Sequence, residues 1–169
     1  MSEDILRIKT PITQDLTATL KEGQRCYITG TVYMARDAAH KRMVEAVKNG
    51  GEFPFDIENQ IIYFAGPCPA KPGKVIGSCG PTTSYRMDAY SPFLLDRGLK
   101  GMIGKGERNG EVTESIKKNK AVYFGATGGA GALLAKCIKS QEIIAYEDLG
   151  AEALRKLYVE DFPVIVLIK

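Results

Sequence analysis

The sequence lacks any run of about 18 consecutive apolar residues, the length that a helix needs to cross a lipid bilayer. Its first ten residues, MSEDILRIKT, also lack the basic start and apolar core that are typical of a secretory signal peptide. We therefore expect no membrane association and a cytoplasmic location.

Clustered metal ligands are scarce as well. His40 is the only histidine, and no two of the four cysteines form a Cys-x-x-Cys pair. This spacing argues against a zinc finger. The cysteines are also not as close in sequence as the cluster ligands of ferredoxins, so we expect no metal site in this chain. Because 44% of the residues are hydrophobic and can build a core, a disulfide framework is not expected either. We interpret the four cysteines as reduced thiols: Cys26, Cys68, Cys79 and Cys137.

Charge of one sign is not in large excess. The chain has 23 basic and 20 acidic residues, which gives a net charge of +3, and its densest basic stretch is the short sequence KKNK at residues 117–120. That stretch is typical of a solvated helix end, where basic side chains favour the negative end of the helix dipole. The charge balance therefore predicts no nucleic-acid partner.

Apolar and amphipathic segments alternate along the 169 residues, a length that fits one domain. No internal repeat or long linker divides the chain, so we expect a single mixed α/β domain over residues 1–169. Runs of β-branched, aromatic and apolar residues predict strands at residues 5–8, 25–32, 61–65, 74–78, 101–103, 121–124, 143–146 and 163–168. Helical spacing predicts helices at residues 37–47, 85–95, 112–118, 130–138 and 151–157.

The first candidate functional segment is residues 30–40, with the sequence GTVYMARDAAH. A predicted strand passes here into a predicted helix, and such junctions are where ligands bind in α/β sheets. Arg36 offers a planar guanidinium that can hold a carboxylate by two hydrogen bonds, beside helix N–H groups that attract anions. The alternative is an ordinary helix start, with Asp37 as its cap, Arg36 on the surface and His40 packed inside.

Residues 77–88, with the sequence GSCGPTTSYRMD, form a second predicted strand-to-helix junction. Thr82, Thr83 and Ser84 place hydroxyls beside the free N–H groups of a helix start, and Arg86 lies one turn further along. Hydroxyls together with a guanidinium suit a small carboxylate or a phosphate. A plain capping turn with a surface arginine explains the same residues equally well.

Two glycine-rich turns complete the candidates. Lys105 stands between Gly104 and Gly106 after a predicted strand, where it points either into a cleft or into solvent. Residues 125–131, with the sequence GATGGAG, look like a dinucleotide-binding loop but lack the G-x-G-x-x-G spacing. Close packing of a strand against a helix, or an anion site at the helix start, is the alternative for this second turn.

Taken together, these segments resemble the C-terminal domain of class I fumarases, which also exists as the separate β subunit of two-chain fumarases and L-tartrate dehydratases. The resemblance rests on the motif around ARDAAH at 35–40, on GPTT with its RMD tail at 80–88 and on GKG at 104–106. It continues through FGATGGA at 124–130, AYEDLGAEA at 145–153 and VEDFP at 159–163, so it covers nearly the whole chain. The GPTT segment with its RMD tail is the most specific part.

The resemblance implies a swivelling β/β/α fold, with a mixed sheet and helices, and an active site completed by a second chain. That partner, the α subunit, would carry a 4Fe-4S cluster whose iron acts as a Lewis acid on the leaving hydroxyl, and the two chains would form a hetero-oligomer. By match to the motifs, Thr82 is the candidate base, and Arg36 has a catalytic as well as a binding role. The residues implied to bind the dicarboxylate substrate are Arg36, Thr82, Thr83, Arg86 and Lys105.

The predicted function is that of the β subunit of an iron–sulfur hydro-lyase, a fumarate hydratase of the tricarboxylic acid cycle that hydrates fumarate reversibly to malate. One alternative is the β subunit of an L-tartrate dehydratase, and another is a non-catalytic module that binds an anion or a phosphate through the glycine-rich loops. A nucleotide-dependent oxidoreductase is a third alternative, which depends on residues 125–131 alone.

Overall fold

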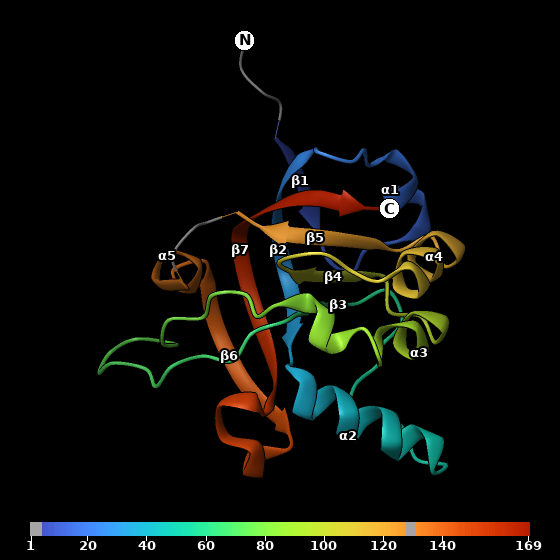
Figure 1. Ribbon diagram of the computed structural model, residues 1–169. Coiled ribbons are helices and arrows are strands. Elements are labelled where there is room, and N and C mark those ends of the chain that lie inside the picture. The colour runs from blue at the N-terminus through green and yellow to red at the C-terminus, as the bar shows by residue number, and fades with distance from the viewer. Residues whose placement is uncertain (1–4, 128–130) are drawn as a thin grey trace.

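The computed structural model describes residues 5–127 and 131–169, which form a seven-stranded sheet with helices packed against it (Figure 1). The strands are β1 (Leu6–Lys9), β2 (Arg25–Met34), β3 (Ile61–Tyr63), β4 (Gly101–Gly104), β5 (Val122–Ala126), β6 (Ile138–Ala145) and β7 (Leu154–Ile168). The α-helices are α1 (Gln14–Thr19), α2 (Asp37–Lys48), α3 (Ser91–Asp96), α4 (Gly110–Lys118) and α5 (Gly131–Ala135), and the 3-10 helices are η1 (Ser84–Met87) and η2 (Glu147–Glu152). The predicted mixed α/β fold is confirmed.

Strand β7 closes this sheet into a small barrel. Strands β2, β3, β4 and β5 lie side by side in parallel, and β7 is antiparallel to both β5 and β2. Val164 of β7 pairs with Cys26 of β2 on one side and with Ala126 of β5 on the other. Strands β1 and β6 are added beside β2 and β7 respectively. The four parallel strands therefore point their carboxyl ends toward the same edge of the barrel.

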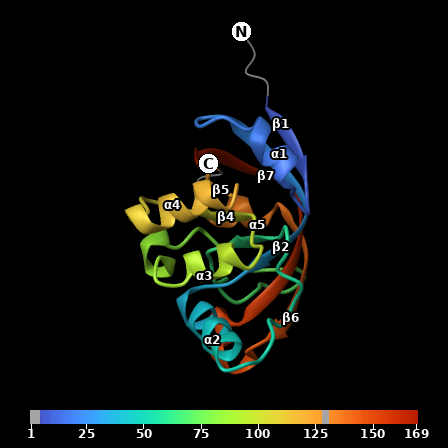
Figure 2. The same ribbon diagram turned by 90° about the vertical axis from the view of Figure 1, so that its right-hand side faces the viewer.

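The short central strands are buried on both faces. Along β3, Ile61 and Tyr63 belong to the hydrophobic core inside the barrel, whereas Ile62 between them belongs to the core under the helices. Helices α2, α3 and α4 gather on one side of the sheet and cover this second core (Figure 2). Burial on both faces explains why these strands have continuous apolar sequences and do not alternate with polar residues.

Two of the predicted elements near the middle of the chain are wrong in their form. Residues 74–78 form no strand, because they fold back on the 68–69 segment, where Cys68 N donates to Ser78 O at 2.9 Å. A Cβ at Gly77 would overlap Cys68 O, so this close approach needs glycine. The predicted helix at 85–95 is divided into η1 and α3, since Pro92 can occupy only the first turn of a helix.

Two predictions in the last third of the chain also need correction. The helix predicted at 151–157 is replaced by the end of η2 and the start of β7, where Arg155 pairs with Met34 and Leu157 with Val32. The helix predicted at 130–138 is α5, which ends at Ala135, and residue 130 lies outside the described residues. At residues 154–157, long-range pairing with β2 therefore outweighs the helical spacing of the local sequence.

The remaining strand and helix predictions are confirmed, with boundaries shifted by up to two residues, except that β6 begins five residues before the predicted strand at 143 and β7 begins nine residues before the predicted strand at 163. In the part of the chain that the structure describes, no helix has the length and apolarity that a membrane span requires.

Gly104, at the carboxyl end of β4, is a position where the packing excludes a side chain. A Cβ there would overlap Ser84 Oγ and lie 2.9 Å from Phe64 Cδ2. We expect Gly104→Ala to lower the free energy of unfolding by about 1–3 kcal/mol, because the added methyl group overpacks this edge. Urea unfolding measures the change. Gly110→Ala is the matched control, since no atom lies within 4 Å of its added Cβ, and equal stability of the two variants would contradict the packing argument.

Candidate functional site

The candidate site lies at the edge where the parallel strands end. Arg36 follows β2 by two residues, Phe64 follows β3 directly, and Lys105 follows β4 directly. The strand pairing continues at this edge, since Phe64 N donates to Ile103 O at 2.8 Å. The carboxyl ends of parallel strands are the usual place for ligands in α/β sheets. Arg36 and Lys105, which are 69 positions apart in the sequence, therefore belong to the same edge of the fold.

The segment 82–84 is fastened across this edge by backbone hydrogen bonds. Thr82 N donates to Phe64 O at 2.7 Å, and Ser84 N donates to Lys105 O at 2.9 Å. Thr83 forms a parallel bridge with Lys105. The structure thus brings four of the five predicted site residues to the carboxyl edge: Arg36, Thr82, Thr83 and Lys105.

Arg86, the fifth predicted residue, lies in η1, two residues after Ser84. Its side chain is exposed, as is that of Lys105, whereas Thr82 and Thr83 are half-buried. Thr83 stands at the N-terminal cap position of η1, but its side chain makes no capping hydrogen bond. The alternative of a plain capping turn is therefore not supported at Thr83, whose hydroxyl is not committed to that role.

Arg36 stands at the start of α2 and is only loosely paired. Its Nε lies 3.6 Å from Glu152 Oε1, and its Nη2 lies 3.8 Å from Asp37 Oδ1, so neither contact is a hydrogen bond. Arg36 Nε and both of these carboxylate oxygens are buried without a hydrogen-bond partner. Arg36 itself occupies the cap position of α2, so Asp37 does not cap the helix as the alternative interpretation expected. The Arg36 side chain is still 28% exposed, so part of it is open to a substrate carboxylate.

Glu152 is a neighbour of Arg36 that no sequence pattern predicts, because it lies 116 positions away and belongs to a segment predicted as a helix. The chain at η2 reaches Arg36 by packing over Gly66, where a Cβ would lie 2.7 Å from Ala151 O and 3.1 Å from Arg36 Cδ. Tertiary packing alone therefore brings this carboxylate to the site.

His40 is a packed residue that braces the same helix start. Its side chain is 0% exposed, and its Nδ1 lies 2.8 Å from Arg36 O. Because a carbonyl oxygen only accepts, Nδ1 must carry the proton, and Nε2 is then a buried acceptor without a partner. Burial lowers the pKa of His40 to about 4, and the nearby Arg108 cation also lowers it, although the hydrogen bond to Arg36 acts in the opposite direction. His40 is therefore neutral at physiological pH.

The thiols are free, and two of them lie in the core. Burial raises the pKa of Cys26 to about 11 and that of Cys79 to about 12, so both stay protonated. Among residues 5–127 and 131–169, no group of three or more histidine, cysteine, aspartate or glutamate side chains is arranged to hold a metal ion.

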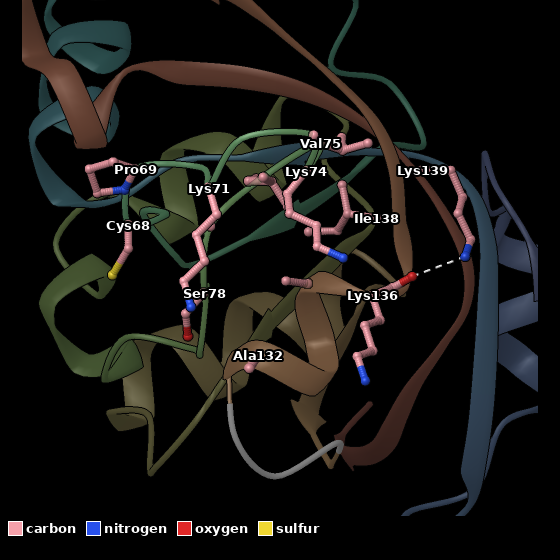
Figure 3. A pocket seen from close by; sticks show the side chains of 14 residues that line it. Cys68, Pro69, Lys71, Lys74, Val75, Ser78, Ala132, Lys136, Ile138 and Lys139 are labelled. Carbon is pink, nitrogen blue, oxygen red and sulfur yellow. Dashed lines mark hydrogen bonds between the residues drawn. The ribbon is translucent and has the colours of Figure 1, made fainter.

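A large pocket elsewhere on the chain does not coincide with the predicted site. It has a volume of about 840 Å³ and lies between the 68–78 segment and the start of β6 (Figure 3). Ile76 and Ile138 are its buried apolar residues, and none of the five predicted site residues lines it. Its four lysines are all exposed: Lys71, Lys74, Lys136 and Lys139.

Gly131, the last residue of the glycine-rich segment at 125–131, packs closely against the segment that leads to Thr82. Cys79 N donates to Gly131 O at 3.3 Å, and a Cβ at Gly131 would lie 2.5 Å from Gly80 N. The close packing expected of this turn is therefore present at Gly131, but it joins the start of α5 to an irregular segment and not to a strand. Residues 128–130 of the turn lie outside the described residues.

Comparison with known proteins shows the family to which the chain belongs. A family model described as Fumarase C-terminus matches residues 2–169. The anaerobic class I fumarate hydratase of Escherichia coli is 42% identical over 146 residues, which cover 85% of this chain and 27% of the relative. Fumarate hydratase 2 of Leishmania major is 39% identical over 148 residues, which cover 86% of this chain and 26% of the relative.

A third relative is similar over most of its own length. A protein of Methanocaldococcus jannaschii, provisionally named L(+)-tartrate dehydratase subunit beta, is 38% identical over 153 residues, which cover 87% of this chain and 78% of the relative. The chain belongs to the Fumarase C-terminus family. It spans about a quarter of the length of the fumarate hydratases that it matches.

His40 should make the stability of the protein depend on pH. Its pKa rises from about 4 in the folded state to the ordinary 6.5 on unfolding, so the unfolded state binds more protons between these values. We expect its contribution to stability to be complete above pH 6.5 and to fall by about 2 kcal/mol between pH 7.5 and pH 5. Urea unfolding at both pH values measures this loss.

His40→Asn is the control for the titration of carboxylates over the same range. Its side-chain N–H₂ group can still donate to Arg36 O but does not titrate. An equal loss of stability in this variant between pH 7.5 and pH 5 would show that His40 is not the responsible group.

Proposed function

We propose that this chain is the β subunit of an iron–sulfur hydro-lyase that hydrates fumarate reversibly to malate, with residues 1–169 acting as one domain. The observation that carries the proposal is the gathering of Arg36, Thr82, Thr83 and Lys105 at one carboxyl edge of the barrel. Membership of the Fumarase C-terminus family supports it independently.

The cationic side chains suit a substrate with two carboxylates. Arg36, Arg86 and Lys105 supply three positive charges, and a dicarboxylate needs at least two separate contacts of this kind. These groups also stabilise the negative charge that develops on a carboxylate when the adjacent carbon loses its proton. We assign Arg36 to this catalytic task, because its guanidinium is held at the edge and its side chain stays partly exposed.

Thr82 is the proposed base. Its backbone N–H is fixed to Phe64 O, which sets the side chain at the end of β3. A threonine hydroxyl must first give up its own proton before it can accept one from carbon, so it needs an activating neighbour in the complete site. Thr83, whose hydroxyl does not cap η1, is proposed as a second contact to the substrate.

We place the 4Fe-4S cluster on a partner α subunit. The described residues of this chain do not fit a cluster, since they offer no suitable group of three ligands. The open, exposed position of Lys105 and Arg86 is consistent with a site that a second chain covers. The relative named as a tartrate dehydratase subunit beta, which is 38% identical to this chain, supports the proposed role as a subunit.

The same relative makes L-tartrate the second candidate substrate. Tartrate and malate are both small hydroxy diacids, so the charged groups at the edge serve either one. Only the groups that contact the second hydroxyl would differ.

Reconstitution with the partner tests the proposed function. We expect the isolated chain to be inactive, and the anaerobically purified complex with its cluster-bearing partner to hydrate fumarate, measured as loss of fumarate absorbance.

The substrate panel includes malate and L-tartrate, and titrations with inorganic phosphate and NAD(P) test the binding-module and oxidoreductase alternatives. Malate dehydration by the isolated chain would contradict the need for a partner, and turnover of tartrate alone would reassign the substrate.

The two threonines should respond differently to the loss of their hydroxyls. We expect Thr82→Val to lower kcat by roughly 10²–10⁴-fold, the usual cost of removing a general base, and Thr82→Ser to keep most of the activity. Thr83→Val should change the apparent affinity for substrate more than kcat and leave the melting temperature nearly unchanged, since no cap is lost.

Exchange of the C3 hydrogen of the substrate in deuterated water measures the base directly. Retention of this exchange at the wild-type rate in Thr82→Val would exclude Thr82 as the base. An inactive Thr83→Val beside an active Thr82→Val would reverse the two assignments.

A further inference from the structure

A buried ion pair lies directly behind the candidate site. Arg108 follows Lys105 by three residues, and its side chain is 0% exposed. Its Nε donates to Asp88 Oδ1 at 2.6 Å, and its Nη2 donates to Ser91 Oγ at 2.7 Å. The other carboxylate oxygen, Asp88 Oδ2, accepts from Asn109 N at 2.9 Å. The pair therefore ties the end of η1 to the turn that carries Lys105.

Two aromatic rings hold the same guanidinium from the side of the sheet. The central carbon of the Arg108 guanidinium lies 4.8 Å from the centroid of the Tyr123 ring and 5.3 Å from that of Phe64. Both distances are within the range of a cation–π contact. Phe64 is also the residue whose carbonyl accepts from Thr82 N, so the ring and the carbonyl connect Arg108 to the Thr82 segment.

A chain of hydrogen bonds completes the connection to Lys105. Lys105 N donates to Ser84 Oγ at 3.1 Å, and the Tyr123 hydroxyl lies 2.7 Å from Ser84 Oγ and 2.8 Å from Gly106 O. Burial raises the pKa of Tyr123, so its hydroxyl keeps its proton. Because the Gly106 carbonyl only accepts, that proton goes to Gly106 O, and Ser84 then donates to Tyr123. Each donor in this series of three hydrogen bonds therefore has one acceptor.

Stability alone does not account for this arrangement. Removing two charges from water is expensive, and a buried ion pair can often be replaced by apolar residues of similar size at no loss of stability. The pair contributes hydrogen bonds with a fixed direction, since the planar guanidinium donates to Asp88 and Ser91 at the same time. Directional bonds of this kind fix the relative position of the segments that they join.

We propose that Arg108 is a positioning residue for the hydration reaction, which with Asp88 holds the Thr82–Thr83 segment at a fixed place relative to Lys105. The proposal rests on the proposed function. Arg108 acts through Asp88, Tyr123 and Ser84, because its own side chain has no exposed surface with which to touch a substrate. Small displacements of a catalytic group from the reacting carbon lower rates by about 10²-fold per ångström, so this fixed spacing is expected to set kcat.

The double variant Arg108→Met/Asp88→Asn removes both charges of the pair, so neither residue is left as an unpaired buried charge. Met fills part of the space of the arginine stem, and the Asn amide oxygen can still accept from Asn109 N. Ser91 Oγ keeps its hydrogen bond to Met87 O at 3.0 Å. We expect a folded protein whose complex with the partner shows kcat lowered by roughly 10- to 100-fold, with a smaller change in KM.

Amide hydrogen exchange in the purified 169-residue chain gives a readout that does not depend on activity. The Ser84 and Lys105 amides, which bond across the edge, should exchange at least about 10-fold faster in the double variant, while the Ile62 and Met102 amides in the core keep their wild-type rates. If the wild-type complex lacks hydratase activity, the proposed function fails, but this exchange experiment still decides whether Arg108 fixes the edge.

Two further variants separate positioning from general stability. Tyr123→Phe removes only the hydroxyl that links Ser84 to Gly106. It should change amide exchange and kcat in the same direction as the double variant, but by a smaller factor. Thr17→Val removes a buried hydroxyl that bonds Lys120 O, before the start of β5, and it should lower the melting temperature without changing kcat.

A folded double variant with wild-type kcat and wild-type exchange at Ser84 and Lys105 overturns the proposal. Faster exchange throughout the core overturns it too, because that result assigns Arg108 a merely structural role. If the double variant does not fold, Tyr123→Phe decides by the same two measurements.

Discussion

The pairing of β7 with both β2 and β5 is the constraint on which the rest of the structure depends. It turns four parallel strands into a closed ring and keeps their carboxyl ends at one edge. It also removes two sheet edges that would otherwise expose unpaired backbone groups. Because Arg36, Phe64 and Lys105 all stand just beyond those strand ends, the closure of the ring decides which side chains share a site.

The polar groups buried under this edge have a common effect. His40 donates to the Arg36 carbonyl, and Arg108 joins Asp88 to the rings of Phe64 and Tyr123. Each fixes backbone that carries a proposed site residue, and neither is exposed. Breaking such a hydrogen bond would leave a buried donor or acceptor unpaired at a cost in free energy, so these contacts permit few alternative arrangements of the edge.

The edge that carries the proposed site is open to solvent. The proposed binding residues Arg86 and Lys105 are exposed, and the large pocket between the 68–78 segment and the start of β6 contains none of the five predicted residues. Enclosing a site strengthens the electrostatic interactions inside it, and an open edge does not enclose a substrate. The proposed partner subunit would cover this edge and enclose the proposed substrate.

The sequence by itself determined most of the strands, the α2 helix and, through its motifs, the residues of the candidate site, because apolar periodicity and short motifs are local properties. Only the tertiary structure decided that residues 154–157 are a strand, since their pairing with β2 spans more than 100 positions and outweighs helical spacing. Only the tertiary structure likewise decided the contacts of Glu152 with Arg36 and of Arg108 with Asp88. These charged residues are of types that occur throughout the sequence, and nothing in their neighbouring residues distinguishes them. Their roles arise from long-range packing, which brings together groups that no local pattern connects.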